Sequence, residues 1–127
     1  MTQARLTISQ YTTADGVHVL ALVGEIDHTT ADTFRRTLTA QHESAPCAVV
    51  DFGHVTFMDS SGINVLVAAN NTNRTRGGWL RLAEVPSPVR DVLRIVGLDD
   101  VIPLYATLNQ ALAAGNAAQA SRTGPGV

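Results

Sequence analysis

Hydrophobic and polar residues alternate at the start of the chain and then give way to an apolar run. Residues 5–11 alternate in polarity, which is typical of a β-strand with one face in solvent. Residues 17–23 are almost all apolar and rich in β-branched side chains, as in a strand covered on both faces. Asp15-Gly16 between them is a strong turn signal. The pattern predicts an antiparallel hairpin made of these two strands.

Helical periodicity is clearest in the second half of the chain. An apolar side chain stands at Val89 and again three, four and seven residues later, which is the spacing of one face of an amphipathic helix. Pro86 and Pro88 suit the first turn of this helix, and Gly97 suits its end. The pattern predicts a helix between these punctuating residues.

Three further helices are predicted from shorter patterns. Residues 29–43 carry an apolar stripe, and Thr29 with Asp32 has the spacing of a capping box. A second helix is expected over about 61–76, and a last one begins after the cap residue Thr107.

Three more strands complete the prediction. Residues 47–52 and 79–83 have the composition of buried strands, and 101–105 suits a short edge strand because Pro103 could not serve in a central one. A loop is expected at 53–54, directly after the first of these strands.

Strands alternate with helices along the chain, which is typical of a parallel sheet with right-handed crossovers. We therefore expect an α/β fold with one domain at 1–114: a mostly parallel sheet of four or five strands, an antiparallel N-terminal hairpin strand and about four helices. Residues 115–127 are small and polar and predict a flexible C-terminal tail.

Composition excludes several classes of function. The 127 residues are 45% apolar and carry a formal net charge of −2, which fits a folded core and gives no electrostatic signal for nucleic acid. All nine basic residues are Arg, which excludes a Schiff-base lysine or a phosphate-loop lysine. The single Cys47 leaves no internal disulfide, and no apolar run approaches the ~20 residues that span a bilayer. We expect a cytoplasmic protein without a membrane span, metal or cofactor.

Two loops, 24–29 and 57–62, follow predicted strands and lead into predicted helices. In open α/β sheets such loops gather outside the carboxyl ends of the strands, where ligands and partners bind. Ser60 stands at a helix start, where unpaired N–H groups and the helix dipole favour a phosphate. Phosphorylation would add about −1.5 to −2 charges beside Asp59 and would repel a partner that contacts the unmodified surface.

A plainer interpretation stands beside this one. Asp59, Ser60 and Ser61 are residues that any helix N-cap needs. Asp27 also precedes a helix, where an acidic side chain is favourable without further function, and His28 suits a solvated loop. Residue types alone leave both interpretations open.

The segment FMDSSG at 57–62 closely resembles the phosphorylation loop of the STAS-domain anti-sigma factor antagonists, also called anti-anti-sigma factors. The match extends back through the strand VVDF at 49–52, and GEIDHT at 24–29 resembles the second signature of this family. In order and spacing the resemblance covers about residues 5–114.

The resemblance implies a phosphorylation switch. Ser60 would accept the phosphate, with Ser61 as the alternative acceptor, and Asp27 would lie beside the site. The unphosphorylated form would bind an anti-sigma factor that is also a serine kinase and thereby free a sigma factor. Phosphorylation would switch binding off, and a PP2C-like phosphatase would reset it; ATP and Mg²⁺ would belong to the kinase. The expected partner-binding residues are Asp27, His28, Thr29, Asp59, Ser61, Gly62 and Asn64.

One position departs from the family pattern. Asn64 stands where the family commonly has a small Gly. The larger side chain is expected to affect how closely a partner packs on the helix, and therefore which partner binds.

Two other functions compete with this one. A serine hydrolase would need Gly at the position of Met58 to form its nucleophile elbow, and no third group to orient a histidine is apparent, so we do not expect an enzyme. A STAS scaffold or regulator in a stress-signalling assembly or a transporter complex stays open, because it would use the same loop.

Overall fold

One five-stranded sheet forms the centre of the computed structural model, which describes residues 5–40 and 46–114. The strands lie in sequence order, and each neighbouring pair is parallel except the first, which is antiparallel. This arrangement confirms the expected α/β domain with an N-terminal hairpin. The predicted tail at 115–127 lies outside the described residues. The strands are β1 (Leu6–Thr12), β2 (His18–Ile26), β3 (Cys47–Met58), β4 (Trp79–Ala83) and β5 (Leu104–Tyr105).

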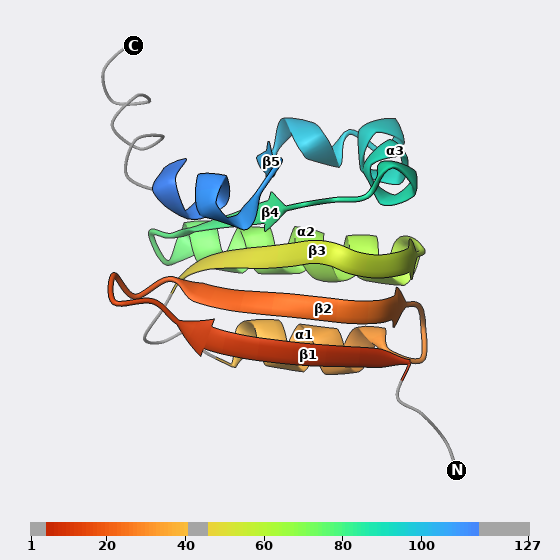
Figure 1. Ribbon diagram of the computed structural model, residues 1–127, viewed down its shortest axis with the longest axis horizontal. Helices are drawn as coiled ribbons and strands as arrows, with labels where there is room; N and C mark the ends of the chain where they lie inside the picture. The colour runs from red at the N-terminus through yellow and green to blue at the C-terminus, as the bar shows by residue number, and fades with distance from the viewer. Residues whose placement is uncertain (1–4, 41–45, 115–127) are drawn as a thin grey trace.

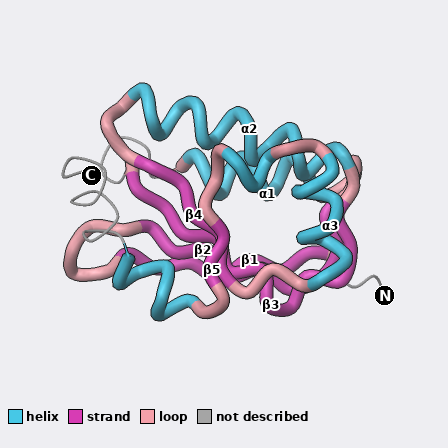
Figure 2. The backbone as a smooth tube through the Cα atoms, turned by 90° about the horizontal axis from the view of Figure 1, so that it is seen from above, coloured by secondary structure: helices cyan, strands magenta, loops and turns pink. Residues whose placement is uncertain are grey.

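Helices cover both faces of this sheet (Figures 1 and 2). The helices α1 (Ala31–Thr39) and α2 (Ser60–Thr75) lie side by side on one face. The helix α3 (Ser87–Ile95) and the 3₁₀ turn η1 (Leu98–Asp100) connect β4 to β5, and the helical residues 108–114 pack on the other face.

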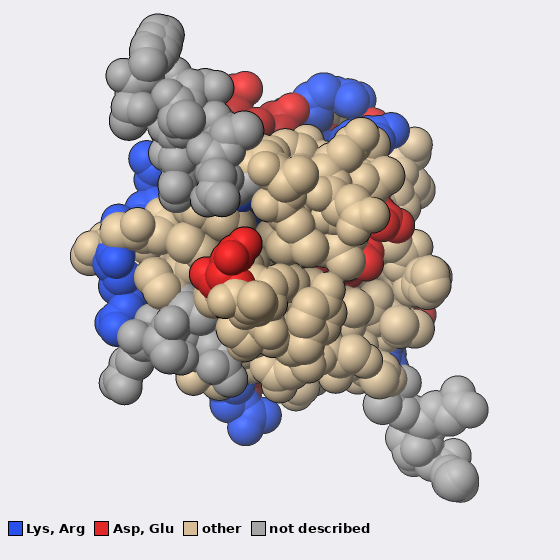
Figure 3. Space-filling model, turned by 60° about the vertical axis from the view of Figure 1, so that its left-hand side comes forward, with Lys and Arg blue, Asp and Glu red and all other residues tan. Residues whose placement is uncertain are grey.

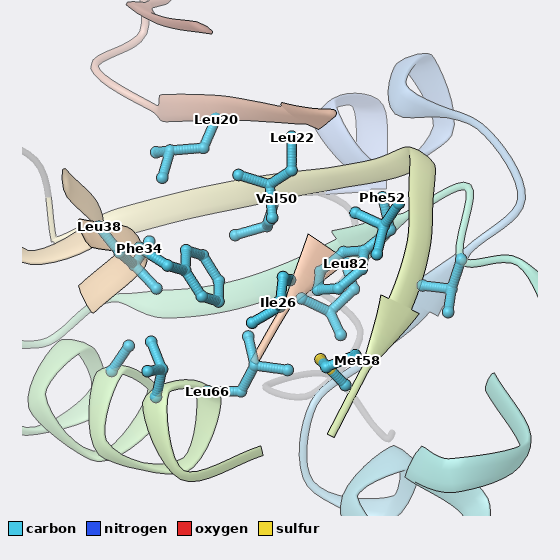
Figure 4. Close-up of a cluster of buried hydrophobic side chains, with 14 of the residues drawn as sticks. Leu20, Leu22, Ile26, Phe34, Leu38, Val50, Phe52, Met58, Leu66 and Leu82 are labelled. Atoms are coloured by element: carbon cyan, nitrogen blue, oxygen red, sulfur yellow. The ribbon is translucent and has the colours of Figure 1, made fainter. Parts of the chain in front are cut away.

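The main core lies between the sheet and the pair α1 and α2. Alternate residues of a strand point to one face, and the apolar residues on this face of β2, β3 and β4 are buried in the core. Figure 4 shows these side chains meeting those of the two helices; each of the following is at most 2% exposed: Leu20, Leu22, Val50, Leu82, Phe34, Leu38 and Leu66.

A smaller cluster covers the opposite face of the central strands. Val49, Trp79 and Ala83 from the sheet pack with Ala111 from the helical residues 108–114. The centre of β3 is therefore buried on both sides, as its continuous apolar run predicted.

The strand β3 is longer than predicted, because it continues through the expected loop at 53–54 to Met58. Its second half pairs with the extended end of β2, up to Ile26 opposite Met58. The pairing of β2 with β3 shifts register twice, and at each shift β3 has one more residue than β2, as in a β-bulge. The exposed residues at 53–54 therefore lie within the paired strand. Gly53 followed by His54 predicted a loop. The sequence does not show that β2 pairs with this segment, which makes it a strand.

The starts of two helices also differ from the prediction. The N-cap of α1 is Thr30, so the capping box expected between Thr29 and Asp32 does not form. The side chain of Thr29 instead bonds Asp27. The helix α2 begins at Ser60, one residue earlier than predicted. The predicted end of the first helix, at 43, lies outside the described residues.

The predicted strand at 101–105 shortens to β5, which has two residues. The unpredicted turn η1 lies directly before it, and residues 101–103 are not in a strand. Gly97, at φ 78°, follows the end of α3 as expected.

Charged side chains are dispersed on the face that Figure 3 shows: Arg side chains lie mostly along the rim and acidic side chains lie in small separate groups. None of the helices within 5–40 and 46–114 is both long and apolar enough to cross a bilayer. In the same residues, no group of three or more His, Cys, Asp or Glu side chains is placed to hold a metal ion.

Candidate functional site

The two loops singled out from the sequence meet at one edge of the sheet. The strands β2 and β3 end side by side, where their arrowheads point to the right in Figure 1. The N–H of Asp59 donates a hydrogen bond to the carbonyl oxygen of Ile26, with an N···O distance of 3.1 Å. The loops therefore adjoin outside the carboxyl ends of neighbouring parallel strands, as predicted.

Asp59, and not a serine, caps the helix α2. Its Oδ1 atom accepts a hydrogen bond from the N–H of Ser61 at 2.8 Å. Ser60 is the first residue of α2 and is exposed, and its hydroxyl has no hydrogen-bond partner among the described residues. The plain capping role thus belongs to Asp59, which leaves the Ser60 hydroxyl available at the positive end of the helix dipole.

Asp27 is buried and held by three donors. Its Oδ1 atom accepts hydrogen bonds from the N–H and the hydroxyl of Thr29, at 2.8 and 2.6 Å. Its Oδ2 atom lies 2.8 Å from a guanidinium nitrogen of Arg5. The two bonds from Thr29 hold the pKa of Asp27 below its ordinary value against the effect of burial, and the charges of Arg5 and His28 act in the same direction.

A second side chain fixes the same loop from inside. The hydroxyl of Thr30 donates to the carbonyl oxygen of Glu25 at 2.9 Å and accepts from the N–H of Asp27 at 3.0 Å. Because Thr30 is also the N-cap of α1, its side chain joins the loop to the start of this helix.

Arg5 is a residue of this site that sequence reasoning missed. Its guanidinium bonds Glu25 as well as Asp27, and these contacts raise the pKa of Arg5, the Glu25 bond most strongly. A signal was present, because Arg5 and Glu25 are equidistant from the turn residue Asp15 and carry opposite charges. The hairpin register, with Leu6 opposite Gly24, places the two side by side.

Gly62 is required by the close approach of α2 to the strand ends. It is buried, and a Cβ atom there would lie 2.5 Å from Cγ of Met58 and 2.9 Å from Cγ2 of Ile26. Its place in the motif is therefore explained by packing.

The exposed surface around Ser60 is partly apolar. Phe57 is 48% exposed at the end of β3, a large fraction for an aromatic side chain. His28, Thr29 and Asn64 are exposed as well. Phe57 was part of the sequence motif but was not predicted as a contact residue, because the sequence placed it in a loop, whereas it lies in β3.

Comparison with known proteins identifies relatives of this chain. An anti-sigma F factor antagonist from Paenibacillus polymyxa is 32% identical over 92 residues, which are 71% of this chain and 79% of that protein. The anti-sigma-F factor antagonist RsfB from Mycobacterium tuberculosis is 33% identical over 101 residues, which are 77% of this chain and 80% of that protein.

A solved structure and a family model lead to the same result. The anti-sigma factor antagonist from Mycobacterium paratuberculosis has a TM-score of 0.78 to this chain at 32% identity, over 87% of this chain and 94% of that one. The model of the STAS domain matches residues 9–111, which include both loops. The chain therefore belongs to the STAS-domain family of anti-sigma factor antagonists.

Proposed function

We propose that this protein is an anti-sigma factor antagonist whose binding is switched off by phosphorylation of Ser60. The observation that carries the proposal is the exposed Ser60 hydroxyl, which is left without a structural role because Asp59 caps α2. The names of the relatives that share about a third of its residues support the choice of an anti-sigma factor as partner.

In the unphosphorylated form, the surface around Ser60 binds an anti-sigma factor that has serine kinase activity, and the sigma factor is released. Phe57 supplies an exposed aromatic side chain of the kind that dominates binding energy at interfaces. His28, Thr29 and Asn64 lie on the same exposed loops and helix turn. Asp27 is buried, so its part is to hold Thr29 in place.

Phosphorylation then changes the charge of this surface. The γ-phosphoryl group of ATP, bound by the kinase with Mg²⁺, transfers to Oγ of Ser60 as the bond to ADP breaks and the hydroxyl proton leaves. The new group carries about −1.5 to −2 charges beside Asp59, while the start of α2 stabilises it. The antagonist therefore stays folded and the partner dissociates, until a PP2C-like phosphatase hydrolyses the phosphoester. The exchange would take place in the cytoplasm, and the chain itself would catalyse no reaction.

The test is phosphorylation in vitro. The purified protein is incubated with candidate anti-sigma factor kinases from its own genome and Mg-ATP, and its intact mass is measured. We expect one added phosphate, which Ser60→Ala abolishes and the matched control Ser61→Ala retains. A phosphate lost only in Ser61→Ala would move the acceptor by one residue. No phosphate with any candidate kinase would contradict the switch, and binding to a large assembly would then indicate a STAS scaffold.

Partner binding gives an independent readout. With the kinase that phosphorylates the protein, Ser60→Asp and Phe57→Ser should each weaken binding at least tenfold, about 1.4 kcal/mol. Arg94→Gln, on the exposed surface of α3, serves as the control and should bind like the wild type. Equal affinity of Ser60→Asp and the wild type would show that charge at this position does not release the partner.

A further inference from the structure

A groove lies between the second half of α2 and residues 98–103, away from the site described above. Two hollows of about 380 and 210 Å³ make it up, and they share lining residues, so they adjoin. The shared residues are Asn70, Arg74, Asp100 and Val101. The outer hollow adds Val67 and Leu98, and the inner hollow reaches β4. We name the two hollows together the α2–η1 groove.

A largely buried asparagine lines the α2–η1 groove. Asn70 is only 7% exposed, and its side chain has no hydrogen bond to any residue in the described part of the chain. It lines both hollows. The amide atoms of Asn70 are not among the buried side-chain atoms that lack a partner, so they face the open hollows. A ligand in the groove could therefore bond this amide, which both donates and accepts.

The inner hollow lies along the part of β4 that β5 does not pair with. The N–H of Trp79 donates to the carbonyl oxygen of Pro46 beside β3, at 3.2 Å, whereas the N–H of Leu82 donates to Pro103 on the opposite side, at 3.0 Å. Hydrogen-bonding directions alternate along a strand, so the N–H and C=O of Leu80 point the same way as those of Leu82.

The strand β5 is too short to cover this part of the edge. It pairs only with Leu82 and Ala83. In the residues that the structure describes, nothing accepts a hydrogen bond from the N–H of Leu80. The inner hollow is lined by Trp79, Leu80 and Arg81, whose side chains alternate between the two faces, so the hollow follows the edge itself.

We propose that the α2–η1 groove is a second binding site, which takes an extended segment of a partner protein that adds to the sheet beside β4. A peptide main chain provides the acceptor and donor that Leu80 lacks, and another peptide group can bond the amide of Asn70. Val67 and Leu98 offer apolar contacts to its side chains. The segment carries one acidic and one basic side chain.

Those two charges follow from the rim of the groove. Arg74 and Asp100 are exposed and of opposite sign, and neither forms an ion pair with another described residue. An acidic side chain would lie near Arg74 and a basic one near Asp100.

This site is separate from the phosphorylation switch. Arg74 lies fourteen residues after Ser60 on α2, which corresponds to about 21 Å at the helical rise of 1.5 Å per residue. The groove goes beyond the proposed function, because nothing in its recognition of a peptide requires Ser60.

The experiment uses the full chain labelled with ¹⁵N and two blocked ten-residue peptides. The first alternates valine and threonine and carries one glutamate and one arginine. The second replaces two central residues of the first with proline, which removes N–H groups needed to pair with a strand. Amide exchange rates and chemical shifts are measured by NMR with each peptide at up to millimolar concentration.

We expect the free protein to exchange the Leu80 amide at least tenfold faster than the Leu82 amide. The first peptide should slow exchange at Leu80 at least tenfold and shift the side-chain resonances of Asn70 in a saturable manner, and the proline peptide should do neither. Equal protection of the two amides before peptide is added, equal effects of the two peptides, or no effect of either would overturn the proposal.

Variants separate this site from the switch. Asn70→Leu should weaken peptide binding at least tenfold, whereas Asn109→Leu, the same change on an exposed position of 108–114, should leave it unchanged. Ser60→Ala should also bind the peptide normally, so a failure of the switch would not be mistaken for a failure of the groove. If Asn70→Leu does not fold, the exposed changes Arg74→Ala and Asp100→Ala take its place, and wild-type binding by both would contradict the site.

Discussion

The main-chain N–H of Asp59 lies 3.1 Å from the carbonyl oxygen of Ile26 and donates a hydrogen bond to it. This bond continues the parallel ladder of β2 and β3 one step beyond the pair of Ile26 and Met58. It joins the loop of Asp27 to the residue that caps α2. The position of Ser60 is therefore set by the packing of two strand ends as well as by its own segment.

Gly62→Ala should destabilise the fold by about 1–3 kcal/mol, because the new methyl group overlaps Met58 and Ile26. At an open helix position the same change stabilises by about 1 kcal/mol, so the sign is informative. Urea unfolding measures it. In a Met58→Ala background the cost of Gly62→Ala should be smaller, since the overlapping side chain is gone. A variant as stable as the wild type would contradict the close approach.

Asp59→Ala should lower the free energy of unfolding by about 0.5–2 kcal/mol, because the N–H of Ser61 loses its acceptor. Asp59→Asn keeps an acceptor oxygen in the same place and should cost much less. Thermal and urea unfolding of the two variants provide the comparison. Equal losses in both would mean that the charge, and not the cap, is what stabilises α2.

The pKa of Asp27 should respond more to Thr29 than to Arg5. The hydroxyl of Thr29 is the largest cause of its lowered pKa, and the charge of Arg5 is a smaller one. Thr29→Val should therefore raise the pKa of the Asp27 carboxyl further than Arg5→Gln does. A pH titration of the carboxyl carbon by NMR measures both. The reverse order would show that the ion pair dominates.

The same carboxyl should make stability depend on pH. Its pKa in the folded protein is below the 3.8 of the unfolded chain, so the unfolded chain binds the proton more readily. This contribution is present above the unfolded value and is lost as pH falls through the folded value. As pH falls below about 3.8, the wild type should therefore lose stability more steeply than Asp27→Asn. Parallel curves would argue against a lowered pKa; Asp32, whose pKa is also lowered, affects both proteins alike.

Gly24→Ala should be far more harmful than Gly16→Ala. Both positions have positive φ, at 123° and 88°, so both substitutions introduce backbone strain of about 1–3 kcal/mol. Only at Gly24 would the Cβ atom also overlap a neighbour, at 2.0 Å from the carbonyl oxygen of Arg5. Urea unfolding should show the larger loss for Gly24→Ala. Similar losses would mean that β1 can move away from this position.

Much of the fold was predictable, because apolar residues recur at every second position on the buried face of a strand and at every third or fourth position on the buried face of a helix. The hairpin, the parallel order of the strands and α3 with its glycine end follow from alternation, from continuous apolar runs and from the spacing of Val89 and Leu93. The meeting of the two loops was predictable too, since parallel neighbouring strands end at the same edge.

Elements that depend on a distant partner were not predicted well. The second half of β3 is a strand because β2 bonds it, and β5 is short because η1 precedes it. The capping box at Thr29 did not form because the hydroxyl of Thr29 bonds Asp27 instead. Local patterns do not show which of two competing partners lies closer in space.

Short-range signals for strand, cap and helix converge near Ser60, so local patterns were enough to place it at a helix start on the carboxyl edge of a parallel sheet. Three features became visible only in three dimensions: Asp59 takes the capping role, Arg5 reaches Asp27 and Asn70 lines a groove. Hydrogen bonds and ion pairs depend on distances of about 3 Å between segments that can lie far apart in the chain, and packing alone sets those distances.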